Sequence, residues 1–255
     1  MIWINEPVKV NHCYDRDILL NVNAFMPGSC VNCSYRETGC LQHQPEEAVA
    51  NFSALLTRYA ISGKGKVIFN QGELVTGQYF LCQGIVKLVR CTEHGKEVIV
   101  DCVTPCSVIG GMSMLGDEQV RIVSAVTVTE RTEVAVLGAP KLLALLRCHP
   151  ELGISFYRHM SDKVRESYKW IAGQSLPARE RVLFLLARVI TKLEPREGKW
   201  ELPCSSQELA QFAQVTPETM SRVMRELEDE GVIRKDKGHL WILKKEAVEL
   251  YLGEG

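Results

Sequence analysis

The sequence of 255 residues lacks long apolar runs and an excess of either charge. Its first segment, MIWINEPVKVNHCYDRD, is too polar for the apolar core of a signal peptide, and no apolar run reaches membrane-spanning length. The formal net charge of -1 gives no general attraction to nucleic acid, although a small basic face can be balanced elsewhere on a protein. We therefore expect a cytoplasmic protein that does not enter a membrane.

Residue arrangements typical of enzymes are also missing. A cysteine nucleophile needs a histidine base, and the nearest pair, His12 and Cys13, are neighbours whose side chains usually point apart. The sequence shows no oxyanion device and no phosphate-binding glycine loop. We expect no enzymatic activity. The ten cysteines are not expected to form structural disulfides, because the cytoplasm is reducing.

What the sequence does contain is a change of hydrophobic period along the chain. Residues 46–60 have helical spacing, and short β-rich pieces separated by glycines then run from Lys64 to about Val136, as in an antiparallel roll. Helical spacing returns at Pro140. We predict an α+β protein with an N-terminal cysteine-rich segment (1–45), an antiparallel β-roll of the jelly-roll kind (46–149), one long helix (150–173) and a C-terminal helical domain (174–255).

The predicted long helix carries an apolar stripe. Its members recur at close to seven-residue spacing, which is typical of the seam between two paired helices. They are Tyr157, Met160, Val164 and Ile171. We expect a homodimer joined along this helix, with packing against the helix's own domain as the alternative.

Two short helices joined by a tight link are predicted from SSQELAQFAQVTPETMSRVMRELEDEGVI. Ser205 and Glu208 have the spacing of a capping box, and Thr216 followed by Pro217 is a suitable start for the second helix. Apolar residues occupy one face of the second helix, which leaves polar side chains pointing outward near its N-terminus. This is the helix-turn-helix arrangement, in which the second helix enters the major groove of DNA.

The polar residues of this region suit DNA. Arg pairs with guanine, Glu accepts from cytosine, and Ser bonds to several base edges. The hairpin predicted around Asp236-Lys237-Gly238 would be a wing that meets phosphates. The candidate DNA-binding residues are Ser206, Thr216, Glu218, Thr219, Ser221, Arg222, Arg225, Lys235 and Lys237. For any one of them, a solvated helix surface is the alternative.

The order of glycine-rich roll, long helix and winged helix-turn-helix resembles the cyclic-AMP receptor and fumarate–nitrate regulator (CRP/FNR) superfamily of bacterial transcription factors. GKVIFNQGE, YFLCQGIVKL, HGKEVIV and SAVTV are similar to its roll, and ELAQFAQVTPETMSRVMRELEDEGVI is the most specific part. Ser221, where the cyclic-AMP receptor has glycine, resembles the anaerobic oxygen-sensing branch. One departure is Gln214 at the usual turn glycine. The resemblance implies a dimer on palindromic double-stranded DNA, with RNA polymerase as a further partner.

The resemblance does not extend to the residues that bind cyclic AMP in this superfamily. Its Gly-Glu pair for the ribose corresponds to Gly110-Gly111 here, and its Arg-Ser pair for the phosphate corresponds to Val123-Ser124. Arg121 lies two residues from the expected guanidinium. A buried phosphate without a cationic partner is poorly compensated. We therefore expect that cyclic AMP is not the effector.

Three cysteines ahead of the roll, Cys30, Cys33 and Cys40, form the pattern C-x2-C-x6-C. The oxygen-sensing branch keeps its iron–sulfur cysteines in this region, and thiolates so spaced suit an iron–sulfur cluster or zinc. The spacing differs from that branch by one residue, and its distant fourth cysteine corresponds to about Ala135. We predict a [4Fe–4S] cluster that senses oxygen or redox state, with Cys106 as the fourth ligand.

The same residues allow several alternatives. Cys102, Cys13 and His43 compete with Cys106 for the fourth position, and His43 would complete C-x2-C-x6-C-x2-H, a structural zinc site. A thiol–disulfide switch at these cysteines needs no metal. A small molecule or haem bound in the roll would give the regulator a different effector. The sequence does not reveal the operator, the regulated genes, or whether the protein activates or represses.

Overall fold

The computed structural model describes residues 30–33, 39–110, 119–191, 193, 195, 197–202, 204–236 and 239–252. These residues fall into two compact units. The first contains Ala54–Val103 and Ser107–Ala144, and the second gathers Ser29–Ser53, Thr104–Cys106 and Leu145–Gly255. The second unit therefore brings together segments that lie far apart in the sequence.

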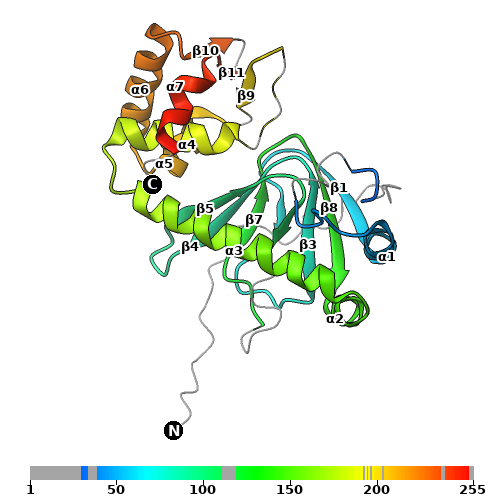
Figure 1. Cartoon of the computed structure of the whole chain (residues 1–255). Coiled ribbons are helices and arrows are strands. Elements are labelled where there is room, and N and C mark those ends of the chain that lie inside the picture. The colour runs from blue at the N-terminus through cyan, green and yellow to red at the C-terminus, as the bar shows by residue number, and fades with distance from the viewer. Residues whose placement is uncertain are drawn as a thin grey trace. The chain divides into compact units, whose positions relative to one another are not determined.

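The first unit is an antiparallel roll of two four-stranded sheets (Figure 1). One sheet has the order β1-β8-β3-β6 and the other has the order β2-β7-β4-β5, and all neighbouring strands run antiparallel. The strands are β1 (Thr57–Ser62), β2 (Val67–Phe69), β3 (Gly77–Gln83), β4 (Val86–Cys91), β5 (Glu97–Val103), β6 (Ser107–Ile109), β7 (Ser124–Thr127) and β8 (Arg131–Gly138). The roll predicted from the sequence is confirmed.

The core of the roll takes side chains from both sheets. β-Branched and aromatic residues are favoured in strands because they pack well on a pleated surface, and burying each contributes about 1.5–3 kcal/mol. The buried cluster consists of Ile68, Phe69, Leu81, Val86, Val103, Ile109, Val123, Ala125 and Val134. Tyr59, Ile61, Tyr79 and Leu88 pack against it.

Three helices flank the strands in the sequence: α1 (Glu46–Leu55), α2 (Ala139–Cys148) and α3 (Pro150–Gly173). Pro150 stands in the first helical turn of α3, where the missing N–H costs nothing. With 24 residues, α3 is roughly 36 Å long. Among the described residues, no helix combines the length and apolar character needed to cross a membrane.

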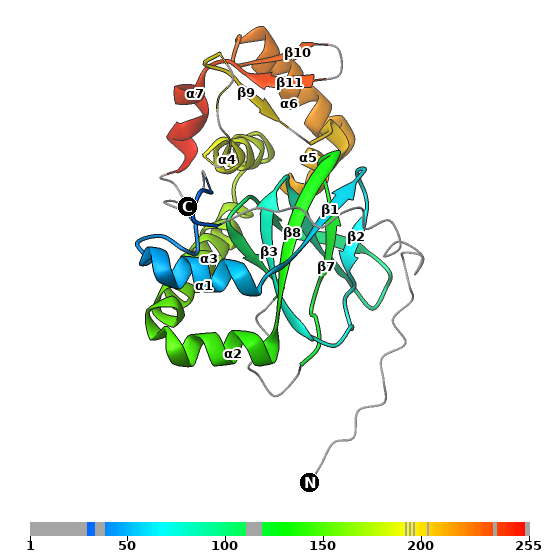
Figure 2. The same ribbon diagram turned by 90° about the vertical axis from the view of Figure 1, so that its right-hand side faces the viewer.

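The C-terminal part of the second unit is a small helical domain with a three-stranded sheet. Its elements are α4 (Ala178–Ile190), β9 (Trp200–Leu202), α5 (Ser206–Ala213), α6 (Pro217–Asp229), β10 (Ile233–Asp236), β11 (His239–Ile242), α7 (Lys245–Glu249) and the 3₁₀ helix η3 (Leu250–Leu252). The helix α4 is buried along most of its length and contacts α5, α6, α7 and β9 (Figure 2). It is the core around which the predicted helix-turn-helix and wing assemble.

Candidate nucleic-acid interface and cysteine site

The first helix of the helix-turn-helix, α5, begins at the predicted cap. The Ser205 hydroxyl accepts from the Glu208 N–H at 3.2 Å, and the Glu208 carboxylate accepts from the Ser205 N–H at 3.0 Å. These reciprocal bonds satisfy two N–H groups that have no partner within the helix. The predicted capping box is therefore confirmed.

The turn between α5 and α6 passes through Gln214, whose φ is 51° and ψ 46°. Glycine adopts this left-handed conformation most easily, so a glutamine here carries a small strain. The Gln214 carbonyl accepts a hydrogen bond from Arg181 Nη2 on α4 at 3.2 Å. A contact from the central helix thus holds the turn.

The second helix, α6, has Thr216 as its N-cap and Pro217 in its first turn, as predicted. The Thr216 hydroxyl accepts from the Thr219 N–H at 3.2 Å. Two hydrogen bonds lower the pKa of Glu218. The larger effect comes from the backbone N–H of Glu218 itself, and the smaller comes from the Thr216 hydroxyl. Glu218 is therefore an ionised carboxylate at a helix N-terminus, where negative charge is favoured.

The remaining side chains of α6 separate into a buried and an exposed face. The buried face consists of Met220, Val223, Met224 and Leu227. The candidate DNA-binding residues on and beside this helix, Thr216, Glu218, Ser221, Arg222 and Arg225, are exposed, Thr219 is half-buried, and Ser206 is exposed on α5. The outward set predicted from the sequence is thus available to a partner.

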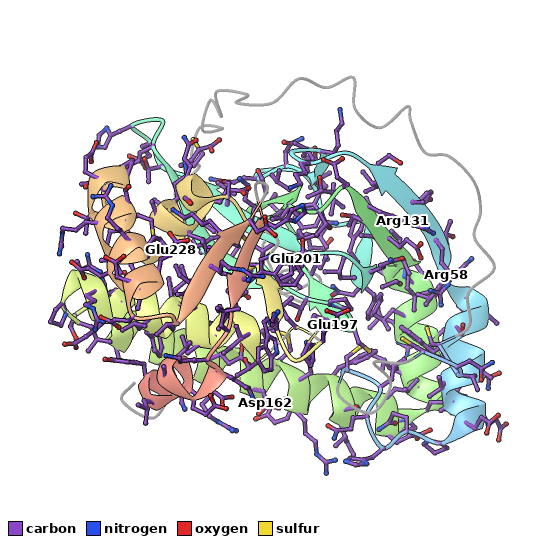
Figure 3. All side chains as sticks on the ribbon, turned by 90° about the horizontal axis from the view of Figure 1, so that it is seen from above. Arg58, Arg131, Asp162, Glu197, Glu201 and Glu228 are labelled. Carbon is purple, nitrogen blue, oxygen red and sulfur yellow. The ribbon has the colours of Figure 1, made fainter. Side chains whose placement is uncertain are left out.

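The predicted wing is the hairpin of β10 and β11. Lys235 is exposed on β10, and its backbone N–H donates at 3.1 Å to Glu228, which Figure 3 labels on α6. The wing is thereby tied to the second helix of the motif. Lys237, the other candidate phosphate contact of the wing, lies outside the described residues.

The apolar stripe of α3 faces outward. Tyr157 is 74% exposed and Ile171 66%, Val164 is also exposed, and Met160 is half-buried. Ile154 belongs to the same exposed set. A row of large apolar side chains is thus left exposed along one helix, the pattern that is typical of a surface covered by a partner.

The cysteines that were predicted as ligands lie together in the second unit. The Cys40 N–H donates to the Cys106 carbonyl at 3.1 Å, and the Cys33 N–H donates to the Cys30 carbonyl at 3.4 Å. The hydrogen bond with the Cys33 side chain lowers the pKa of Cys106. The opposite effects outweigh it and raise this pKa to about 12: the hydrogen bond with Cys40, burial, and the charges of the nearby Cys40 and Cys30 side chains. Cys30 and Cys40 are buried, and Cys33 and Cys106 are half-buried.

The backbone at Gly39 and at Cys106 is closely packed within this group of cysteines. A Cβ added at Gly39 would overlap the side chain and the carbonyl of Cys106, so only glycine fits at this position. Cys106 itself has φ 59°, a conformation in which non-glycine residues are uncommon. The described residues contain no group of three or more His, Cys, Asp or Glu side chains already arranged to hold a metal ion.

Of the other candidates for the fourth ligand, two lie among the described residues and one does not. Cys102 is on β5, in the first unit, and its N–H donates to Asp101. His43 has an exposed side chain. Cys13 is outside the described residues. Among the candidates that the structure describes, Cys106 is the one whose interaction with the side chains of Cys33, Cys40 and Cys30 is observed.

Sequence reasoning missed two contacts between this cysteine site and the helices. The Ser155 hydroxyl on α3 donates to the Cys40 carbonyl at 2.9 Å, and the Cys30 N–H donates to the Ser53 hydroxyl on α1 at 3.1 Å. Ser155 is buried although most of α3 is not. A single serine within a helix gives no sequence signal for so distant a partner.

The interior of the roll holds an arginine. Arg121, two residues from the position at which the superfamily has its guanidinium, is 4% exposed. It donates to the Gly110 carbonyl at 3.0 Å and the Gly77 carbonyl at 3.3 Å, and lies 4.0 Å from the ring centre of Phe69 and 4.9 Å from that of Tyr79. Burial lowers the pKa of Arg121, but arginine stays protonated in proteins.

Comparison with known proteins agrees with this architecture. Residues 62–149 match the family model of the cyclic nucleotide-binding domain, and residues 180–251 match that of the Crp-like helix-turn-helix domain. The Cyclic AMP receptor protein of Thermus thermophilus is 34% identical over 69% of this chain and 79% of its own. The chain belongs to the CRP/FNR family.

Other relatives in the CRP/FNR family cover more of the chain. Transcriptional activator protein anr of Pseudomonas aeruginosa is 24% identical over 91% of this chain and 94% of its own. The solved structure of FixK2 from Bradyrhizobium japonicum has a TM-score of 0.67 at 18% identity and covers 77% of this chain and 96% of that chain, which shows the shared fold. This member of the CRP/FNR family is a DNA-binding transcription regulator and not an enzyme.

Proposed function

We propose that this regulator responds to oxygen or redox state through a [4Fe–4S] cluster held by Cys30, Cys33, Cys40 and Cys106, and that cyclic AMP is not its effector. The observation that carries the proposal is the meeting of four cysteines from two distant regions of the sequence in one largely buried place. Proteins of a reducing compartment seldom use such a group for disulfides.

The four cysteines have the chemistry that an iron–sulfur cluster requires, although they are not already arranged around a metal position. Four thiols are the usual ligand set of such clusters, which supply a centre that is labile to oxygen or to a change of redox state. Cys106 occupies a backbone conformation that glycine would adopt with less strain, and strained residues that persist often serve a function. Gly39 allows the Cys106 side chain to lie directly against the segment that carries Cys40.

The route from this site to the rest of the regulator starts at Cys40. Its N–H is bonded to Cys106 and its carbonyl to Ser155, so the peptide of one proposed ligand is fixed on both sides. Ser155 lies on α3 between Ile154 and Tyr157, which are exposed. A rearrangement of the cysteine site would therefore reach the buried side of α3, the helix through whose exposed stripe we propose that two copies pair.

The interior of the roll supports the exclusion of cyclic AMP. Arg121 lies over the neighbouring rings of Phe69 and Tyr79, and its bonds go to backbone carbonyls of the roll. At the positions that the superfamily uses for phosphate, Val123 is buried and the Ser124 hydroxyl accepts from the Gln71 N–H at 2.9 Å. These groups are engaged in the fold itself.

For DNA recognition, we propose a homodimer that places one α6 in each of two successive major grooves of a palindromic site. Arg222, Glu218 and Ser221 would read bases, and Lys235 and Lys237 would contact phosphates. Arg222→Ala should then cost about 1–3 kcal/mol of binding free energy and relax the base preference, whereas Lys237→Ala should weaken binding to DNA of every sequence alike. RNA polymerase is the further partner that a transcription regulator of this kind would engage.

The deciding experiment is anaerobic purification followed by iron, sulfide and zinc analysis, with an absorption spectrum before and after air. We expect about four irons and four sulfides per chain and a visible band that air removes. Cys106→Ser should abolish the band, and Cys102→Ser, which changes a thiol on β5, should leave it intact. A colourless protein with one zinc per chain would overturn the proposal, as would a DNA response that survives replacement of Cys30, Cys33 and Cys40 together.

A further inference from the structure

The recognition helix α6 has an unusual distribution of charge. Its C-terminal end carries four acidic residues, Glu226, Glu228, Asp229 and Glu230, and no basic residue stands in its last turn. Carboxylates at a helix C-terminus are opposed by the helix dipole, and near DNA they repel phosphates. The arrangement is therefore unfavourable both for the helix and for DNA binding unless these side chains serve another purpose.

Three of these carboxylates are engaged by groups of the DNA-binding domain. Glu226 uses its two oxygens for two arginines: Oε1 lies 2.8 Å from Arg222 Nη1 on the same helix, and Oε2 lies 3.5 Å from Arg179 Nε on α4. Arg179 Nη2 also contacts both oxygens of Glu230, at 2.7 and 2.9 Å. Glu228 accepts from the backbone of the wing at Lys235, as described above.

The bridging carboxylate of Glu226 bears directly on the proposed base contact. Arg222 is largely exposed, with a side-chain exposure of 62%, and an unrestrained arginine loses rotamer freedom when it is ordered on a base. Glu226 restrains the guanidinium of Arg222, and Arg179 restrains Glu226 from the opposite side. The chain of contacts runs from the central helix to the side chain that we assign to a guanine.

We propose that Glu226 and Arg179 are positioning residues that set the base specificity of Arg222, and that Arg179 in addition neutralises the acidic end of α6 toward DNA. The inference rests on the proposed base contact of Arg222. The two residues differ in their effect on general DNA affinity. Glu226 improves the preference of Arg222 for one base but lowers the affinity for any duplex, whereas Arg179 increases both the base preference and the affinity.

The test begins with selection of duplexes from a random pool by the wild-type protein and by Arg222→Ala, which identifies the base pair that Arg222 reads. Binding to the selected duplex, to the same duplex changed at that base pair, and to an unrelated duplex is then measured for Glu226→Gln and Arg179→Gln. The matched control is Glu249→Gln, because Lys245 and Glu249 form another i,i+4 pair, 2.7 Å long and half-buried, on α7.

We expect both variants to reduce the preference at that base pair by roughly two- to fivefold, the range of a solvent-exposed ion pair. For the unrelated duplex, Glu226→Gln should bind more tightly and Arg179→Gln more weakly, each by roughly two- to fivefold, and the differences should shrink as salt is raised. Glu249→Gln should change neither quantity.

Three outcomes would overturn the inference. If Glu226→Gln keeps the full base preference, Glu226 does not position Arg222. If both variants weaken all duplexes alike, the contacts only stabilise the domain. If Arg222→Ala itself leaves every base preference unchanged, the proposed base contact fails, and the inference fails with it.

Discussion

The bond between Ser155 and Cys40 offers a sharp test of how the cysteine site is built. Both residues are buried, and the 2.9 Å bond joins positions 115 residues apart in the sequence. Ser155→Ala removes the donor and leaves the Cys40 carbonyl buried, which costs about 1–3 kcal/mol. Alanine recovers about 0.5 kcal/mol through its higher helix propensity. The expected net loss is therefore roughly 0.5–2.5 kcal/mol.

The helix supplies its own control for this change. Ser167 also lies on α3, but its hydroxyl is exposed and donates to the Lys163 carbonyl within the helix. Ser167→Ala should be neutral or stabilise by about 0.5 kcal/mol. Denaturant unfolding of the reduced, metal-free protein, together with amide hydrogen exchange around Cys40, measures both variants. If Ser155→Ala loses no more stability than Ser167→Ala, the bond does not secure the site.

The same variant tests the proposed route from the cysteines to α3. A coupling between two sites of a protein is typically about 1–3 kcal/mol, and one neutral hydrogen bond contributes about 0.5–1.5 kcal/mol. Ser155→Ala should therefore reduce the ratio of DNA affinities between the anaerobic and the air-treated protein, while the iron content stays the same. An undiminished ratio at unchanged iron content would refute the route through Ser155.

Three further predictions concern other parts of the fold. Gly173→Ala should destabilise by about 1–3 kcal/mol because its Cβ would lie 2.6 Å from an aromatic ring of α4. Gly153→Ala, on the same helix with 3.9 Å of space, should stabilise by about 1 kcal/mol; thermal unfolding compares the two. Arg121→Met should cost roughly 1–3 kcal/mol by leaving carbonyls unpaired, and calorimetry should detect no cyclic AMP binding before or after the change. Thr216→Ala should cost about 1 kcal/mol of stability and raise the pKa of Glu218, which NMR titration measures. Because folding lowers the pKa of Glu218, the contribution of this carboxylate to stability is present above the usual pKa of 4.5 and is lost as the pH falls through the folded pKa.

The elements that could be predicted from the sequence are those with local causes. Ser205, Thr216 and Pro217 mark helix starts through bonds to residues three positions away or through a fixed φ, so α5 and α6 begin where the sequence predicts. The strands of the roll follow from short runs of β-branched and aromatic residues between glycines. Such signals need no knowledge of the rest of the chain.

The cysteine site could be predicted only in part, because its completion depends on tertiary structure. The close spacing of Cys30, Cys33 and Cys40 is visible in the sequence, but Cys106 comes after five strands of the roll and competed with three other residues. Its place is fixed by a backbone bond to Cys40 and by the space that Gly39 leaves. Neither contact has a periodic or local signature.

Arg121 shows how a comparison by aligned positions fails where side-chain length matters. Its position lies two residues from the one that the superfamily uses for phosphate, so the aligned position itself shows no guanidinium. A long side chain reaches over that distance, and two aromatic rings and two carbonyls receive it. A charged group that is hydrogen-bonded within the fold stabilises the roll but leaves less scope to compensate a second, incoming charge. The roll thus keeps the architecture of a cyclic nucleotide-binding domain while its own guanidinium occupies the interior, and this shifts the search for the signal to the cysteines.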